Sequence, residues 1–159
     1  MARAKTQLTV APGVVLNRLT AEQVADLCVQ WEVAFPADRS DIHIEQFMWH
    51  VFSAERYSSV SGDAALAEYG KHEAPKYLVL SNDKDQGLVT DLRPESASLA
   101  DYLVCPLNWA WTMAFTHEDG WLGPYFARHR DYDRLEASNR KGMRKRHEAE
   151  VAKQRGWSR

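Results

Sequence analysis

The first long run of regularly spaced apolar residues predicts an amphipathic helix. Thr20-Ala-Glu-Gln23 has the form of a capping box, in which Thr20 is the N-cap and Gln23 reaches back to it. Apolar side chains then recur at steps of three and four residues until Pro36, which stops the run: Val24, Leu27, Cys28, Trp31 and Phe35. The spacing predicts a helix over residues 22–35.

Two further helices are predicted in the first half of the chain. A polar hinge at residues 38–42 precedes apolar positions at helical spacing, which predict a second helix over residues 41–54. The run at residues 48–52 is also compatible with a strand, because short apolar runs are ambiguous. Ser61-Gly62-Asp63 is typical of a turn and cap, and it predicts a third helix over residues 64–72.

Several shorter segments are predicted to be extended. Residues 76–80 are aromatic, β-branched and aliphatic, and after a polar turn residues 87–90 return as the second strand of a hairpin. Val14-Val15-Leu16 forms a short extended piece near the N-terminus. Residues 96–103 are compatible with a short helix or with an irregular approach to a strand.

The most regular strand pattern lies at residues 108–116. Large apolar side chains, from Trp109 to Phe115, alternate there with the small side chains of residues 110, 112, 114 and 116. Such a strand needs a helix over its small-residue face. Asp119-Gly120 predicts a tight turn, and residues 121–126 begin the partner strand.

The order of these elements predicts an α+β fold. We expect a mainly antiparallel sheet of three to five strands, with the helices packed on one face. Residues 1–19 are predicted to be an N-terminal arm, residues 20–127 a single domain, and residues 128–159 a basic helical tail interrupted at Gly142 and Gly156.

Composition and charge narrow the class of protein. The 159 residues are 45% hydrophobic and 26% charged, which is typical of one globular domain. No run of 18 apolar residues and no signal-peptide pattern is present, so we expect no membrane association. Cys28 and Cys105 lie 77 residues apart, which favours two buried thiols in a cytoplasmic protein.

The charge is divided unevenly along the chain. Residues 1–126 hold 9 Lys and Arg against 17 Asp and Glu, a net charge of −8, whereas residues 127–159 hold 11 against 5, a net charge of +6. Five of the cations fall within residues 140–146. This tail would suit phosphate contacts, but a solvated helix explains it more simply, so we do not expect nucleic-acid binding. The acidic body would suit a cationic protein partner.

The sequence carries none of the common catalytic motifs. It lacks GxGxxG, GxxxxGK[ST], GxSxG, HExxH and CxxC, and its six histidines show no metal-ligand spacing on one helix face. We therefore expect no cofactor and no metal. If His50 and His117 came together with Glu118, a two-histidine carboxylate site would be conceivable.

The candidates for chemistry are His117, Glu118, His50 and Tyr125. His117 and Glu118 lie at a predicted strand end, where a histidine beside a carboxylate suits general acid–base work. A structural role is favoured, in which His117 and Asp119 bond the turn and Glu118 faces water. His50 lies on an apolar helix face, which favours a core histidine.

Several short motifs together resemble a known family. They are Trp49-His50-Val51-Phe52, Trp111-Thr112, Thr116-His117-Glu118 and Gly123-Pro124-Tyr125-Phe126. This set is similar to the bacterial domain of unknown function numbered 4275, over roughly residues 20–128. The resemblance implies a compact α+β domain without an established reaction. In size and acidity the chain also resembles the immunity proteins encoded beside polymorphic toxins.

Two functions remain as hypotheses. The first is a cytoplasmic binding protein of the immunity type, which neutralises a cationic partner such as a toxin domain. The alternative is a small hydrolase or metal-dependent enzyme that uses His117, Glu118 and His50. The sequence favours the first, because it carries no catalytic motif.

Overall fold

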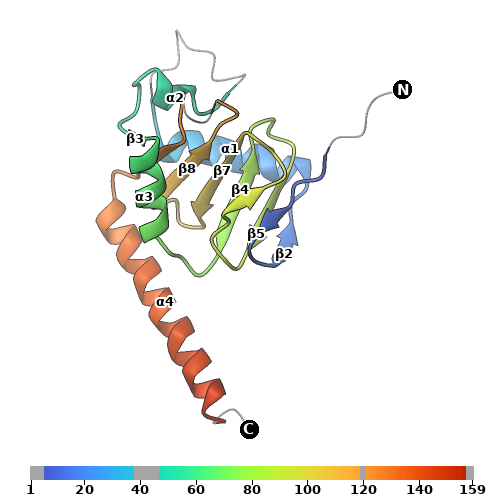
Figure 1. Cartoon of the computed structure of the whole chain (residues 1–159), viewed down its shortest axis with the longest axis vertical. Coiled ribbons are helices and arrows are strands. Elements are labelled where there is room, and N and C mark those ends of the chain that lie inside the picture. The colour runs from blue at the N-terminus through green and yellow to red at the C-terminus, as the bar shows by residue number, and fades with distance from the viewer. Residues whose placement is uncertain (1–5, 38–46, 119–120, 157–159) are drawn as a thin grey trace.

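A computed structural model describes residues 6–37, 47–118 and 121–156. Within this part of the chain a seven-stranded sheet runs through the body (Figure 1), and every pair of neighbouring strands is antiparallel. Its strands in spatial order are β2 (Val15–Arg18), β5 (Gly87–Thr90), β4 (Tyr77–Ser81), β7 (Tyr102–Pro106), β8 (Trp111–Phe115), β9 (Tyr125–Arg128) and β3 (Val60–Ser61). A separate ribbon pairs β1 (Val10–Ala11) with β6 (Ser96–Ala97).

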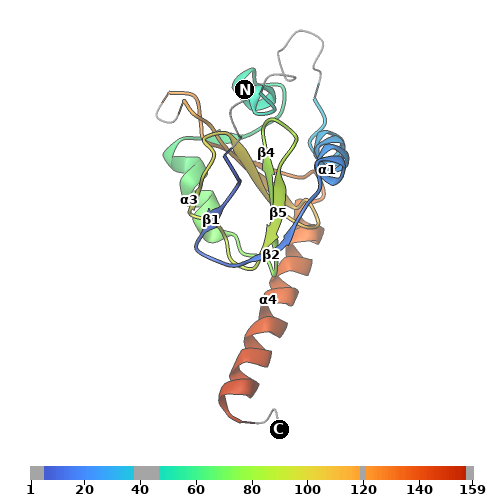
Figure 2. The same cartoon turned by 90° about the vertical axis from the view of Figure 1, so that its right-hand side faces the viewer.

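The helices cover both faces of this sheet. Figure 2 shows α1 (Ala21–Ala34) on one side of it and α3 (Asp63–Lys71) on the other. The short α2 (His50–Ser53) lies above one end of the sheet, and α4 (Tyr132–Gln154) leaves the body at the opposite end (Figure 1). None of the helices in the described ranges is long and apolar enough to cross a bilayer.

The predicted first helix is confirmed, together with its capping box. The Thr20 hydroxyl accepts a hydrogen bond from the Gln23 backbone, and the Gln23 side chain accepts one from the Thr20 backbone. Trp31 is fully buried, and its indole Nε1 donates to Thr112 Oγ1 on β8 over 3.0 Å. This bond ties α1 to the centre of the sheet.

The alternation along β8 separates the core into two layers. Thr112 and Ala114 face α1, which confirms that a helix covers the small-residue face of this strand. Trp111 and Met113 point to the other face, where they pack with Tyr69 of α3. The strand itself starts at Trp111. Trp109 lies outside it with a φ of 63° and packs with the α1 layer, so its predicted place on the large-residue face is wrong.

The predicted size of the sheet and its one-sided packing are also wrong. The α+β class and the antiparallel pairing are confirmed, but the sheet has seven strands, because short segments such as β2 and β3 add to its edges. Apolar side chains on both faces of β8 need cover, so α1 and α3 pack on opposite faces. The first part of the predicted second helix, residues 41–46, lies outside the described residues; within residues 47–54 the helix α2 covers only His50–Ser53.

The N-terminal segment and the helix near the C-terminus pack more closely against the rest of the protein than the sequence indicated. Leu8, within the predicted arm, is 1% exposed, and β1 and β2 follow it. The basic helix near the C-terminus is confirmed as α4, but Gly142 does not interrupt it. Instead Gly142 faces Pro75 so closely that an added Cβ would lie 2.6 Å from the proline Cγ. Gly156, with a φ of +71°, follows the end of α4.

Candidate functional sites

The residues singled out from the sequence gather around one buried indole ring. Trp49 is 2% exposed, and its ring centroid lies 4.6 Å from that of His50 and 6.2 Å from those of His117 and Tyr125. Glu118 joins the group through His117, whose Nε2 lies 3.5 Å from its Oε1. The structure therefore brings all four candidate residues together, at the end of the sheet next to α2.

The group is organised by a carboxylate that the sequence analysis did not identify. Asp101 Oδ1 accepts hydrogen bonds from Trp49 Nε1 and from the His117 backbone, each over 3.1 Å. The His117 Nδ1–H also donates to Asp101, with both carboxylate oxygens 2.9 Å away. The strand register explains this meeting, because Tyr102 of β7 pairs with Phe115 of β8, and Asp101 and His117 lie just beyond that pair.

The His117 ring contacts the carboxylates of Asp101 and Glu118. The predicted bond between His117 and the turn involves residues 119–120 and stays a prediction, whereas the expectation that Glu118 faces water is wrong. Glu118 does not simply face water: its Oε2 is buried and has no hydrogen-bond partner among the described residues. Because β8 ends at Phe115, the alternation of a strand does not apply to His117 and Glu118, and the two side chains lie close together. Asp119 and Gly120 lie outside the described residues.

The electrostatics of His117 favour a proton donor over a base. The hydrogen bond to Asp101 raises the pKa of His117, and the charges of Asp101 and Glu118 raise it further. Burial also raises the pKa of the Tyr125 hydroxyl, which therefore stays protonated. Across the described part of the chain, no group of three or more His, Cys, Asp or Glu side chains is arranged to hold a metal ion, and this includes His50, His117 and Glu118.

Both cysteines are free and buried, as predicted. Burial raises the pKa of Cys28 to about 11 and that of Cys105 to about 12. Because the thiolate is the nucleophilic form, neither side chain is suited to nucleophilic catalysis.

The outward face of α1 carries an exposed stripe of acidic and apolar residues. Glu22, Asp26, Val29 and Val33 follow one another at helical steps, so they lie along one face; we call them the α1 stripe. Val29 is 60% exposed and Val33 is 73% exposed. Neither Glu22 nor Asp26 forms an ion pair with a described residue.

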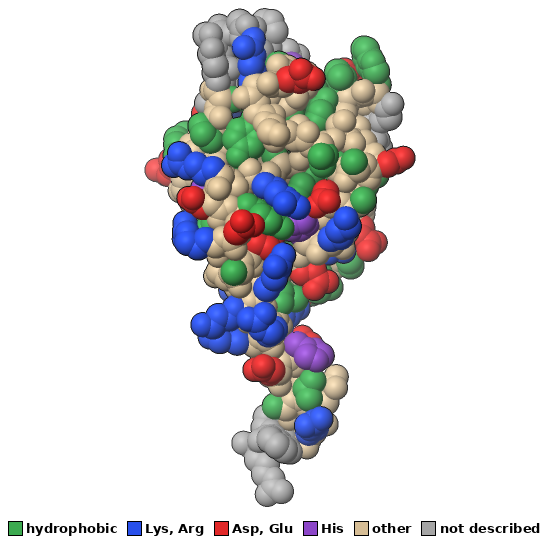
Figure 3. Space-filling model, turned by 90° about the vertical axis from the view of Figure 1, so that its left-hand side faces the viewer, with side chains coloured by type: hydrophobic (Ala, Val, Ile, Leu, Met, Phe, Trp, Pro, Cys, Tyr) green, Lys and Arg blue, Asp and Glu red, His purple; other side chains and the backbone are tan. Residues whose placement is uncertain are grey.

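A cleft of about 530 Å³ lies where α3 meets α4, and no pattern in the sequence indicated it. Figure 3 shows this face of the molecule, with acidic and basic side chains interspersed over the two helices. At the base of the cleft His72 is buried, and its Nδ1 lies 2.6 Å from the Glu68 carbonyl. His72 Nε2 lies 2.6 Å from the Tyr132 hydroxyl. Glu136, which is 3% exposed, lines the same cleft.

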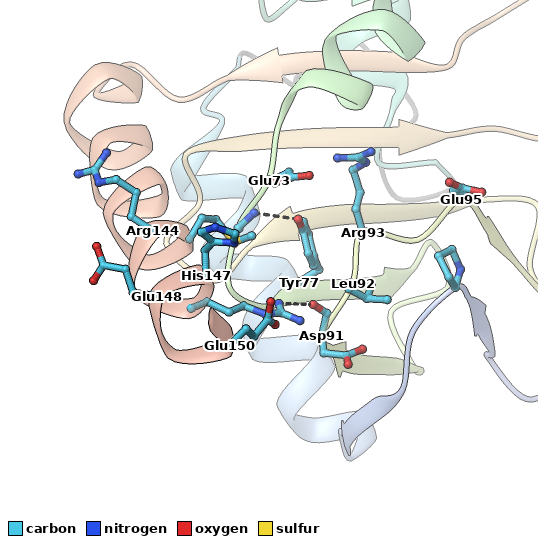
Figure 4. Close-up of a pocket in the computed structure, with 14 residues that line it drawn as sticks. Glu73, Tyr77, Asp91, Leu92, Arg93, Glu95, Arg144, His147, Glu148 and Glu150 are labelled. Atoms are coloured by element: carbon cyan, nitrogen blue, oxygen red, sulfur yellow. Dashed lines mark hydrogen bonds and ion pairs between the residues drawn. The ribbon is translucent and has the colours of Figure 1, made fainter. Parts of the chain in front are cut away.

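A second cleft, of about 790 Å³, lies further along α4 (Figure 4). There His147 of α4 lies toward a wall that includes Tyr77 and Arg93, while Arg144 and Glu148 of the same helix extend away from that wall. The polar groups of Tyr77 and Arg93 already form hydrogen bonds with the backbone. The Tyr77 hydroxyl accepts from the Ala74 backbone, and Arg93 donates to the His72 carbonyl. The α3–α4 cleft differs because a buried carboxylate oxygen there, Glu136 Oε2, has no hydrogen-bond partner among the described residues.

Together these features define a small α+β protein with a sheet covered on both faces and clefts against its C-terminal helix. The chain belongs to the family described as Domain of unknown function (DUF4275), whose model matches residues 25–126. The predicted family is thus confirmed. Comparison with curated proteins and comparison with solved structures each gave no match. Tyr132, Glu136 and the rest of α4 lie beyond the matched residues.

Proposed function

We propose that this protein binds a basic protein partner and neutralises it, in the manner of an immunity protein that blocks a cationic toxin domain. The observation that carries the proposal is the α1 stripe. Two valines stand exposed on a regular helix, in line with two carboxylates that make no ion pair with a described residue.

The stripe has the chemistry of a docking surface for a cationic protein. Apolar side chains at the centre of an interface exclude water, and charged groups beside them determine which partners bind. The stripe belongs to a segment, residues 1–126, with a net charge of −8. A surface of this charge speeds encounter with a basic partner, and the advantage declines as salt is added.

The test uses basic proteins encoded by genes next to this one, purified and titrated against the full chain by calorimetry. We expect one of them to bind, with an affinity that falls as ionic strength rises. The charge-reversal variant Glu22→Lys/Asp26→Lys should weaken binding by about tenfold or more, because like charges across an interface repel. Val33→Ser should also weaken it, through loss of the apolar centre.

Matched controls lie elsewhere on the surface. Glu95→Lys changes an exposed acid outside the stripe, and Leu66→Ser changes a half-exposed leucine on α3, so both should bind as the parent does. Failure of every neighbouring basic protein to bind would contradict the proposal. Equal binding by the parent and the Glu22→Lys/Asp26→Lys variant would contradict the assignment of the surface.

A second candidate function is acid–base chemistry at His117. The observation in its favour is the exposed imidazole held by the Asp101 carboxylate, since orientation of a histidine by an acid is common in active sites. Elemental analysis of the purified protein tests the metal-dependent form of this idea. A stoichiometric metal that is lost in His117→Ala would support it, and a metal-free parent would count against it.

A further inference from the structure

One oxygen of the buried Glu136 carboxylate, Oε2, is the starting point. Buried polar side chains are nearly always hydrogen-bonded, and a buried carboxylate is costly unless it is paired. Glu136 is 3% exposed, lines the α3–α4 cleft, and its Oε2 has no hydrogen-bond partner among the described residues. Burial raises the pKa of Glu136, and the Asn139 side chain and the nearby arginines offset this only in part.

The neighbouring histidine does not satisfy this carboxylate. A backbone carbonyl can only accept a hydrogen bond, so His72 Nδ1 carries the proton that goes to the Glu68 carbonyl. His72 Nε2 is then free to accept the Tyr132 hydroxyl proton. Burial lowers the pKa of His72, which keeps the ring neutral. Its Nε2 lies 3.8 Å from Glu136 Oε2, too far for a hydrogen bond.

The rim of the cleft has the opposite charge. Arg140 and Arg144 line it, are exposed, and make no ion pair with a described residue. Arg128, also on the rim, is already paired with Glu68 over 3.3 Å and lies over the Tyr132 ring. Two unpaired guanidinium groups suit a phosphate or a carboxylate, since each presents several donors in a plane.

We propose that the α3–α4 cleft binds a small zwitterion. Its ammonium group bonds the Glu136 carboxylate, and its anionic group, a phosphate or a carboxylate, pairs with Arg140 and Arg144. This site is separate from the α1 stripe and does not depend on the function proposed for that surface.

The dimensions limit the size of the molecule. Glu136 and Arg140 are one turn apart on α4, and a helix rises about 1.5 Å per residue, so their backbones are about 6 Å apart along the axis. A ligand with a few bonds between its charged ends spans this distance. The cleft volume of about 530 Å³ lies within the range of small-molecule sites, about 300–1,000 Å³.

The test is calorimetric titration of the full chain with phosphoethanolamine and with 4-aminobutyrate, which carry a phosphate and a carboxylate respectively. Inorganic phosphate and ethanolamine serve as controls, because each carries only one of the two charged groups of phosphoethanolamine. We expect saturable binding of at least one zwitterion, about tenfold or more tighter than either half. Glu136→Gln should weaken that binding about 10- to 100-fold, because a charged hydrogen bond is lost.

Further variants separate ligand binding from folding. Arg140→Ala/Arg144→Ala should also weaken binding, whereas Arg134→Ala, on the same helix but paired with Asp131 outside the cleft, should not. Glu136→Gln removes a buried charge, so it should melt no lower than the parent at neutral pH. If that variant does not fold, the double arginine variant still decides the question, because both side chains are exposed.

Three results would overturn the proposal. The first is the absence of binding by both zwitterions at concentrations up to about 10 mM, well above the range of a useful site. The second is equal affinity for a zwitterion and for inorganic phosphate, which would leave only an anion site at the rim. The third is undiminished binding by Glu136→Gln.

Discussion

Replacement of Asp101 separates two roles that this residue combines. Asp101→Asn keeps an acceptor for Trp49 and for the His117 backbone but removes the negative charge. Asp101→Ala removes both. A buried donor left without a partner costs about 1–3 kcal/mol, and Trp49, whose indole would lose its acceptor, is 2% exposed. For a chain of this length that loss lowers the melting temperature of Asp101→Ala by about 2–12 °C.

The same pair of variants tests the electrostatics of His117. Because the Asp101 hydrogen bond raises the pKa of His117, both variants should return that pKa toward the ordinary value of about 6.5. A raised pKa in the folded state stabilises the protein below the unfolded-state pKa, and the stabilisation is lost as pH rises through the folded-state pKa. The melting temperatures of the parent and Asp101→Asn should therefore differ more near about pH 5.5 than near about pH 9.

The measurements are thermal melts across this pH range and an NMR titration of the His117 ring. His117→Ala is the control, since it removes the titrating group and should abolish the pH dependence of the difference. An unchanged pKa of His117 in Asp101→Asn would refute the electrostatic reasoning. An Asp101→Ala variant that melts with the parent would show that Asp101 does not hold Trp49 in place.

Three further results are expected. Thr112→Val should lower the melting temperature by about 2–12 °C, because Trp31 Nε1 loses its buried acceptor, but it should cost much less in a Trp31→Phe background. Gly142→Ala should destabilise the protein although alanine favours helices by about 1 kcal/mol, because its Cβ would meet Pro75; a stabilised variant would contradict that packing. Neither buried thiol should react with a thiol reagent until the protein unfolds; rapid labelling of the native chain would contradict their burial.

Local patterns were sufficient to predict much of the fold. The capping box at Thr20 and the spacing up to Phe35 predicted α1 almost to the residue. The alternation around Thr112 predicted β8 and the helix over its small-residue face. These signals are reliable because apolar side chains recur every three to four residues in a helix and every two residues in a strand. The edge strands β2 and β3, of four and two residues, are too short to show a period, so the predicted sheet was too small.

The sites depend on contacts between residues distant in sequence. His117 was a candidate because of its neighbours, but its strongest partner, Asp101, is 16 residues away and is brought close by the pairing of β7 with β8. His72 and Tyr132 are 60 residues apart, and no local pattern connects them. Glu136 has the appearance of one more charge on a polar helix until the packing of α4 buries it.

The uneven distribution of charge along the sequence is partly compensated once the chain is folded. In sequence, the basic end of the chain would suit contacts with phosphates, although a solvated helix explained it more simply. In the structure, Arg128 pairs with Glu68, while Arg146 donates to the Asp91 carbonyl and lies 3.5 Å from Glu150. Such contacts compensate part of the basic charge within the protein itself. The acids of the α1 stripe have no such partners among the described residues, so added salt should act on the proposed partner binding chiefly through that surface.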